Sequence, residues 1–338
     1  MINFFGTMPS GRQSSLYTIS CGGVTASVTD CGAALMGLTV PGPAGSADDV
    51  VLGYDCAEDC LKGSAFIGAT VGRNANRLKG SAFSIGGRVY PMVPNEGRNN
   101  LHSGPDCFHL RLWEVASYLE DSITFSLHSP SGDQGFPGNA DIRVTYRLDA
   151  QGGLHILYDA VCDQDAVFNL TNHSYFNLAG HDHPERAMEQ LLTLPARFFT
   201  PADSESIPTG EMRPVAGTPM DFRVPKPIGQ DIDKDYDALT LQHGYDHNFE
   251  VFCNPCAVLQ DPGSGRTMTV STDCPGLQFY AGNFLSEHGK GGVFYGKHGG
   301  VALETQFFPD ALHHPQWKQP VVKAGQPYHS ETVYRFFW

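Results

Sequence analysis

Short runs of apolar and β-branched residues recur about every ten residues along this chain, and turn-forming residues separate them. The chain holds 38 Gly and 23 Pro, which is more turn-forming residue than average usage supplies. Apolar residues with helical spacing over twelve or more positions are absent, and Ala187–Leu192 is the best candidate for a single helical turn. This pattern predicts an all-β protein with little helix, built as a large sandwich or a barrel. The predicted strands lie at Val24–Val28, Val50–Leu52, Trp113–Tyr118, Ile123–Leu127, Ile142–Leu148, Leu154–Val161, Thr267–Thr272, Leu277–Tyr280 and Val301–Thr305.

One local turn and the overall organisation can also be predicted. Phe83–Tyr90 carries Gly86-Gly87 at its centre, which is typical of a β-hairpin with a two-residue turn. The chain has no internal repeat, no low-complexity tract and no linker composition. We therefore expect residues 1–338 to form one domain.

The charge balance excludes several classes of partner. Lys and Arg number 22 against 36 Asp and Glu, so the formal net charge is -14. Nucleic acids and anionic membranes both select basic surfaces, and no Lys/Arg-rich cluster occurs here. No run of 18 apolar residues is present, and residues Met1–Gly6 lack the features of a signal peptide. We expect a small, neutral partner and a cytoplasmic protein that is a monomer or a homodimer.

The cysteine and histidine pattern does not favour a metal site. Nine cysteines are spread along the chain without a dense framework, which is typical of a reducing compartment. Cys253 and Cys256 have CxxC spacing, but a zinc site needs a second ligand pair at characteristic spacing. His181 and His183 alternate with polar residues in a Gly- and Pro-flanked loop. We expect no metal and no other cofactor.

Four segments combine polar or titratable residues with apolar neighbours. A buried polar group that lacks a partner costs about 1–3 kcal/mol, so such segments need hydrogen-bond partners. A polyol can supply many partners at once, although a polar network that only stabilises loops would have the same composition. The four segments are Gly72–Arg77, Asn99–Gly104, Phe168–Leu178 and Ala302–Phe308.

These segments also carry a resemblance to a known family. From about Cys31 to the end of the printed sequence, the chain resembles the aldose 1-epimerase (galactose mutarotase) family. Ser103 departs from the family pattern, which commonly has Gly there, and Asn74 occupies a variable position. The matching motifs are Gly72-Arg73 with Asn76-Arg77, Asn100–His102, Gly135–Gly138, Asn172–Leu178, Ile207–Gly210, Gly217–Pro219 with Asp221-Phe222, Gly244–Phe249, Gly276–Gln278, Leu303–Gln306 and Pro309-Asp310.

The resemblance implies a supersandwich fold of the galactose mutarotase type and interconversion of the α and β anomers of a free hexose. It implies that Glu304 is the catalytic base and His173 the catalytic acid. Ordinary pKa values of about 4.3 and 6.5 would let an ionised Glu and a protonatable His coexist near neutrality. The resemblance also implies substrate contacts from Asn76, Arg77, His102, Tyr175, Asp246 and Gln278.

Three other functions remain open from the sequence. A glycosidase could use Asp246 and Glu304 as its carboxylate pair. A hexose-6-phosphate 1-epimerase of the same fold would need a cationic pocket, for which Arg73, Arg77 and Arg98 are candidates. A non-catalytic sugar-binding protein would use the same polar groups without turnover.

Overall fold

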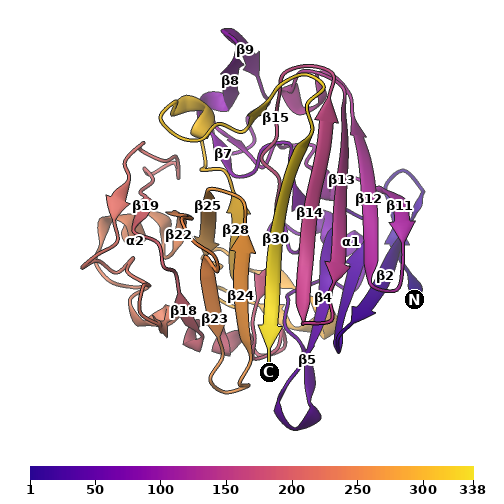
Figure 1. The fold of residues 1–338 in the computed structure, drawn as a ribbon, viewed down its shortest axis with the longest axis vertical. Helices are drawn as coiled ribbons and strands as arrows, with labels where there is room; N and C mark the ends of the chain where they lie inside the picture. The colour runs from indigo at the N-terminus through magenta and orange to yellow at the C-terminus, as the bar shows by residue number, and fades with distance from the viewer.

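Antiparallel strands form most of the regular structure, in agreement with the sequence prediction (Figure 1). The computed structural model describes residues 1–338, except for the side chain of Ala44. Its largest sheet has nine strands, and the C-terminal strand β30 lies at the centre of that sheet between β14 and β24. In spatial order the nine strands are β11 (Glu114–Tyr118), β12 (Ser122–Ser129), β13 (Ala140–Leu148), β14 (Gly153–Cys162), β30 (Tyr328–Phe337), β24 (Thr267–Thr272), β23 (Ala257–Gln260), β18 (Leu191–Thr193) and β21 (Lys226–Pro227).

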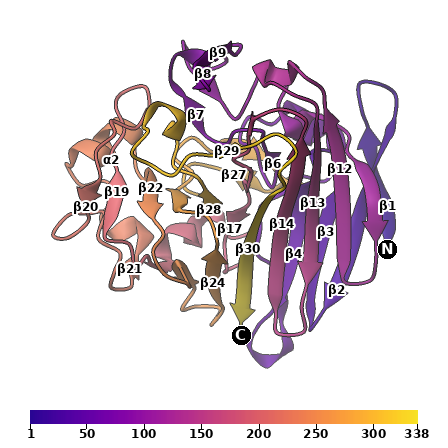
Figure 2. The same cartoon turned by 45° about the horizontal axis from the view of Figure 1, so that its top comes forward.

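Two smaller sheets pack against the nine-stranded sheet (Figure 2). They meet at their edges, where the Leu52 N–H donates to the Tyr175 carbonyl at 3.0 Å. The five-stranded sheet has the order β1 (Ile2–Thr7), β2 (Gln13–Cys21), β3 (Val24–Thr29), β4 (Ala34–Pro41) and β5 (Ala47–Asp49). The six-stranded sheet has the order β17 (Tyr175–Phe176), β28 (Val301–Gln306), β25 (Gly276–Tyr280), β22 (Asp246–Glu250), β19 (Phe198–Thr200) and β20 (Arg213–Pro214).

The main hydrophobic core lies between these layers. It joins alternate residues of the nine-stranded sheet, such as Phe125 and Ile142, to residues of both smaller sheets, such as Val28 and Phe279. In β13 the burial pattern alternates strictly between buried and less buried positions, as expected for a strand with one face on a core. Two tyrosines also cross the core by hydrogen bonds: Tyr146 donates to the Ala33 carbonyl at 2.7 Å and Tyr334 donates to the Leu303 carbonyl at 2.9 Å.

Short pairs of strands cap the sandwich. One is the predicted hairpin, formed by β8 and β9, with Gly86 at φ 59° and Gly87 at φ 84°. Positive φ at both turn residues is what a type I′ turn requires, so the prediction is confirmed. The pairs are β8 (Ala82–Ile85) with β9 (Arg88–Pro91), β6 (Thr70–Val71) with β16 (Thr171–Asn172), β7 (Arg77–Leu78) with β10 (Asn100–Leu101), β15 (Ala166–Val167) with β29 (Val321–Val322), and β26 (Glu287–His288) with β27 (Phe294–Tyr295).

Two local predictions were wrong. Val50–Leu52 is not a strand, because only Val51 makes an isolated bridge, to Phe176, at the junction of the two smaller sheets. The helical turn expected at Ala187–Leu192 lies earlier, as a 3-10 turn at Pro184–Glu189, and β18 begins at Leu191. The two α-helices, α1 (Ala57–Lys62) and α2 (Asp237–Gln242), have six residues each, so the prediction of little helix is confirmed.

None of the helices in the described part of the chain has the length and apolar character needed to traverse a bilayer.

Candidate active site

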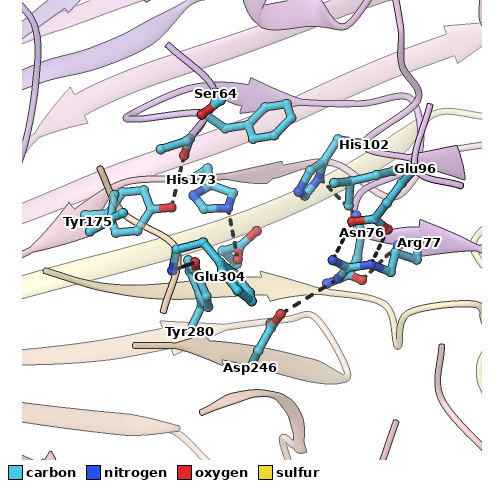
Figure 3. A pocket seen from close by; sticks show the side chains of 15 residues that line it. Ser64, Asn76, Arg77, Glu96, His102, His173, Tyr175, Asp246, Tyr280 and Glu304 are labelled. Atoms are coloured by element: carbon cyan, nitrogen blue, oxygen red, sulfur yellow. Dashed lines mark hydrogen bonds and ion pairs between the residues drawn. The ribbon is translucent and has the colours of Figure 1, made fainter. Parts of the chain in front are cut away.

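A polar pocket lies where β28, β25 and β22 of the six-stranded sheet meet several loops (Figure 3). Its empty volume, including the open mouth, is about 700 Å³. The pocket brings together seven of the eight site residues inferred from the sequence, and Gln278 is the exception. The lining residues are Ser64, Ala65, Phe66, Asn76, Arg77, Glu96, Leu101, His102, His173, Tyr175, Asp246, Tyr280, Phe284, Leu285 and Glu304.

Glu304 and His173 face each other inside this pocket (Figure 3). Glu304 Oε1 lies 3.7 Å from His173 Nε2, too far for a direct hydrogen bond. The side chain of Glu304 is only 2% exposed, and neither its Oε2 nor His173 Nδ1 has a partner. The pair therefore offers a proton acceptor and a proton donor to a ligand at one place.

Burial moves both groups toward their neutral forms. It raises the pKa of Glu304 well above its ordinary value, and the charge of Asp246 adds to this shift while Arg77 opposes it. Burial also lowers the pKa of His173 to about 4. Burial therefore disfavours the charged form of both groups.

The loop that carries His173 is fixed by its neighbours. Asn172 donates from Nδ2 to the Gly68 carbonyl at 2.9 Å and to the Tyr146 hydroxyl at 3.0 Å. The main chain of His173 is held on both sides: its N–H donates to Ala69 at 2.9 Å, and its carbonyl accepts from the Gly68 N–H at 3.0 Å. The amides and hydroxyls of this segment therefore position the imidazole, which is the loop-stabilising role that the sequence left open.

His102 presents a defined hydrogen-bond donor. Its Nδ1 accepts the backbone N–H of Asn76 at 3.1 Å, so the neutral ring carries its proton on Nε2. Burial lowers the pKa of His102 well below its ordinary value, and nearby His173 and Arg77 add to the shift. His102 is thus a neutral N–H donor in the pocket.

Arg77 lies between two carboxylates (Figure 3). Its Nε and Nη2 donate to Glu96 at 2.6 and 2.8 Å, and its Nη1 lies 3.8 Å from Asp246 Oδ2. A ligand hydroxyl can bridge that gap, because it can accept from the guanidinium and donate to the carboxylate. The geometry therefore fits recognition of hydroxyl groups.

The side chains of Gln278 and Tyr175 are both hydrogen-bonded to other protein groups. Gln278 Nε2 donates to Asp246 Oδ1 at 2.6 Å from an adjoining small cavity, where Asn248 has no partner for either amide atom. Tyr175 lines the pocket, and its hydroxyl donates to the carbonyl of Ala65, another lining residue, at 3.0 Å.

Two arginines suggested by the sequence lie elsewhere. Arg73 is fully buried and donates to Ser129 and to the carbonyls of Pro137 and Gly138. Arg98 is exposed and pairs with Glu205. Neither lines the pocket, so a cationic pocket built from Arg73, Arg77 and Arg98 does not form.

The departure at Ser103 is accommodated locally. Its hydroxyl accepts from the Asn74 N–H and donates to the Asn74 carbonyl, both at 2.9 Å. The hydroxyl therefore links the two segments that carry Asn76 and His102.

Several pocket residues were not identified from the sequence. The ring of Phe66 stacks on His173 with centroids 5.9 Å apart and also contacts His102 at 4.7 Å. Tyr280 stands next to Asp246 in the strand register, and its hydroxyl accepts from the Phe284 N–H at 2.9 Å. Glu96 lies in a polar loop with no distinguishing pattern, and only the folded chain brings it to Arg77.

The potential metal ligands are engaged in other ways. The Cys256 thiol donates to the Val270 carbonyl, Cys253 is exposed, and His181 Nδ1 hydrogen-bonds to the Tyr295 hydroxyl. Among the described residues, no three His, Cys, Asp or Glu side chains are grouped to hold a metal ion.

Comparison with known proteins identifies the family. The family model described as aldose 1-epimerase matches residues 15–335. The galactose mutarotase of Sus scrofa is 38% identical over 98% of this chain and 97% of its own length, and the aldose 1-epimerase of Escherichia coli is 35% identical over 97% and 96%. The crystal structure of an aldose epimerase homologue from C. elegans superposes with a TM-score of 0.89 at 34% identity, covering 96% of this chain and 99% of that one. The chain belongs to the aldose 1-epimerase family.

Proposed function

We propose that this protein is a mutarotase that interconverts the α and β anomers of a free aldose such as D-galactose. The observation that carries the proposal is the buried Glu304–His173 pair, with 3.7 Å between Oε1 and Nε2, in a pocket lined by hydroxyl-binding groups. The two oxygens of a hemiacetal share one carbon, so an acid and a base that act on both must lie close together. Relatives named galactose mutarotase, at up to 38% identity, add support for galactose as the substrate.

In the proposed reaction, Glu304 and His173 exchange protons with the two hemiacetal oxygens. Ionised Glu304 removes the proton from the anomeric hydroxyl, and protonated His173 gives a proton to the ring oxygen as the C1–O5 bond breaks. Rotation about C1–C2 then turns the other carbonyl face toward the ring hydroxyl. Protonated Glu304 and neutral His173 reclose the ring by the reverse transfers, so no proton is gained or lost overall. Each proton transfer contributes roughly 10²–10⁴-fold.

The ring-opening and ring-closing forms of the pair differ only in which of the two groups holds the proton. The proposed cycle therefore needs no net uptake of a proton from solvent.

The remaining pocket groups would hold the sugar. His102 donates from Nε2, and Arg77 and Asp246 bracket a hydroxyl across their 3.8 Å gap. Asn76 lines the same wall, Tyr175 supplies an apolar face, and Gln278 holds Asp246 in place.

The pocket charges favour a free aldose over a phosphorylated one. The carboxylates of Glu96 and Asp246 face a single guanidinium, that of Arg77, among the described lining residues. A phosphate group, which carries roughly one and a half to two negative charges, would meet carboxylates there instead of free cations.

Polarimetry tests the proposed function. Purified protein should accelerate the change in optical rotation of freshly dissolved α-D-galactose, and EDTA should leave the rate unchanged. Relaxation at the spontaneous rate would contradict the proposal and leave a sugar-binding protein. Release of reducing sugar from a galactoside would instead indicate a glycosidase.

We also propose that the protein is cytoplasmic, as a monomer or a homodimer. All nine cysteines are free thiols, which supports a reducing compartment.

A further inference from the structure

Glu96 makes a bidentate ion pair with Arg77 at the edge of the pocket (Figure 3). Its two carboxylate oxygens accept from Arg77 Nε at 2.6 Å and from Nη2 at 2.8 Å. The Arg77 side chain is 14% exposed, whereas that of Glu96 is 36% exposed. A mostly buried guanidinium is thus paired with a carboxylate that reaches solvent.

This pairing determines which N–H groups of Arg77 remain for a ligand. A guanidinium has five N–H donors in one plane, and Glu96 takes two of them from one edge. The two N–H groups of Nη1 and one of Nη2 stay free. Nη1 is held 3.8 Å from Asp246, short of a direct hydrogen bond.

Without Glu96, Asp246 would be the nearest anion to Arg77. The guanidinium would then gain by closing the 3.8 Å gap, and the two groups would satisfy each other instead of a sugar hydroxyl. Glu96 therefore keeps both Arg77 and Asp246 available to a ligand.

Glu96 also sets the net charge of this part of the pocket. Arg77 is the only Lys or Arg among the described lining residues, and Glu96 neutralises it at hydrogen-bond distance. The charge of Asp246 is then not offset by a free cation. An anionic substituent on the sugar finds no unpaired positive charge.

We propose that Glu96 is a positioning and specificity residue, which orients Arg77 toward sugar hydroxyls and directs the pocket toward uncharged over phosphorylated aldoses. This inference rests on the proposed function. Glu96 acts through Arg77 and does not transfer protons.

The test compares Glu96→Gln with a matched control, Glu205→Gln. Glu205 also accepts from Nε and Nη2 of an arginine, Arg98, but that pair lies outside the pocket. Loss of one charge-assisted hydrogen bond changes an equilibrium by about ten- to a hundredfold. Glu96→Gln should therefore raise KM for galactose at least tenfold with little change in kcat, and Glu205→Gln should change neither.

The phosphorylated sugar provides the second measurement. Calorimetric titration with galactose and with galactose 6-phosphate gives a ratio of dissociation constants that does not depend on turnover. Glu96→Gln should shift this ratio at least tenfold toward the phosphate, while Glu205→Gln should leave it at the wild-type value. Glu96→Asp keeps the charge but shortens the reach, so it should keep the wild-type ratio and still raise KM.

Thermal unfolding shows whether each variant is folded, and Glu96→Asp provides the test if Glu96→Gln is not. Two outcomes would overturn the inference. In the first, Glu96→Gln and Glu205→Gln have the same KM and the same ratio of dissociation constants for the two sugars. In the second, Glu96→Asp shifts that ratio as much as Glu96→Gln does. The proposed function fails separately, if the wild-type protein does not accelerate mutarotation, and the binding ratio still tests Glu96 in that case.

Discussion

At the scale of single residues, the proposed chemistry depends on two buried ionisable side chains, Glu304 and His173. Their residue types and positions could be inferred from the sequence through family motifs, together with Asn76, Arg77 and Asp246. Their protonation states could not, because the shifts come from burial that only the assembled sheets and loops create. Glu96 was missed for a related reason, since its partner Arg77 is nineteen residues away and no local pattern joins them.

Glu304→Gln should reduce the mutarotation rate by roughly 10²–10⁴-fold while galactose binding remains, because the amide cannot accept the hydroxyl proton.

The same change should raise Tm near neutral pH. The folded pKa of Glu304 is raised above its ordinary 4.5, so the unfolded chain ionises more readily and wild-type stability falls as pH rises above that value. The gain in Tm should therefore shrink toward pH 4.5. Polarimetry, calorimetric binding and melting curves at both pH values check this; a gain that grows on acidification would contradict it.

The histidine makes a separate prediction about pH. Its pKa of about 4 means that the imidazole should be neutral in the free enzyme at pH 5.5, below the ordinary value of 6.5. The catalytically competent pair holds one proton, so kcat/KM should rise as pH increases through about 4 and fall where Glu304 ionises. Nitrogen-15 NMR of the imidazole, with His173→Asn to assign the signal, gives its protonation state. An imidazolium signal from His173 at pH 5.5 would show that burial does not control this group.

At the scale of elements, strands supply Glu304 and Asp246, and loops supply His173, Asn76 and His102. The strands were largely predictable, because period-two burial leaves a clear trace in sequences such as β13 and β24. The junction at Val50–Leu52 was not, because an apolar run at the meeting of two sheets has the same composition as a strand. The loops were recognisable only as unusual polar segments, since their geometry depends on partners such as Gly68 and Tyr146.

Gly68 offers a test of how the His173 loop is held. Its φ is +70°, and a Cβ there would lie 2.0 Å from the Leu35 carbonyl oxygen. Gly68→Ala should therefore displace the segment that binds the His173 main chain. The variant should have a lower Tm, and its mutarotation rate should fall at least tenfold. Gly11→Ala is the control, because Gly11 has φ +81° but nothing within 4 Å of the added Cβ. It should cost only the backbone strain, about 1–2 kcal/mol, with full activity. Equal effects of the two variants on activity would mean that Gly68 does not position His173.

At the scale of the whole molecule, the two smaller sheets share one nine-stranded partner. Strand β30 enters that sheet from the far end of the sequence and separates strands of residues 114–162 from those of residues 191–272. Tyr146 and Tyr334 reach from this sheet to the five-stranded and six-stranded sheets, respectively. The all-β class was predictable from strand spacing, which left a sandwich and a barrel open, and the family resemblance implied the sandwich. This insertion was not predictable, because pairing between distant segments leaves no local pattern. The arrangement supports our proposal that residues 1–338 form one domain.

One domain should unfold in one step, and two matched core substitutions test this. Phe125 packs toward the five-stranded sheet, against Tyr17 at 5.9 Å, and Phe279 lies in the six-stranded sheet, against Tyr245 at 5.1 Å. Both are fully buried, so Phe→Leu at either position should cost about 1–2 kcal/mol. If the sheets unfold together, each variant should lower the temperature of a single calorimetric transition by about the same amount, with calorimetric and van't Hoff enthalpies equal. If the part of the core at the five-stranded sheet and the part at the six-stranded sheet unfold independently, each variant should show two transitions. The transition at the lower temperature would then belong to the part that contains the substitution. The shared core and the hydrogen bonds of Tyr146 and Tyr334 predict a single transition. The pocket in the six-stranded sheet would then lose its structure only when the whole sandwich unfolds.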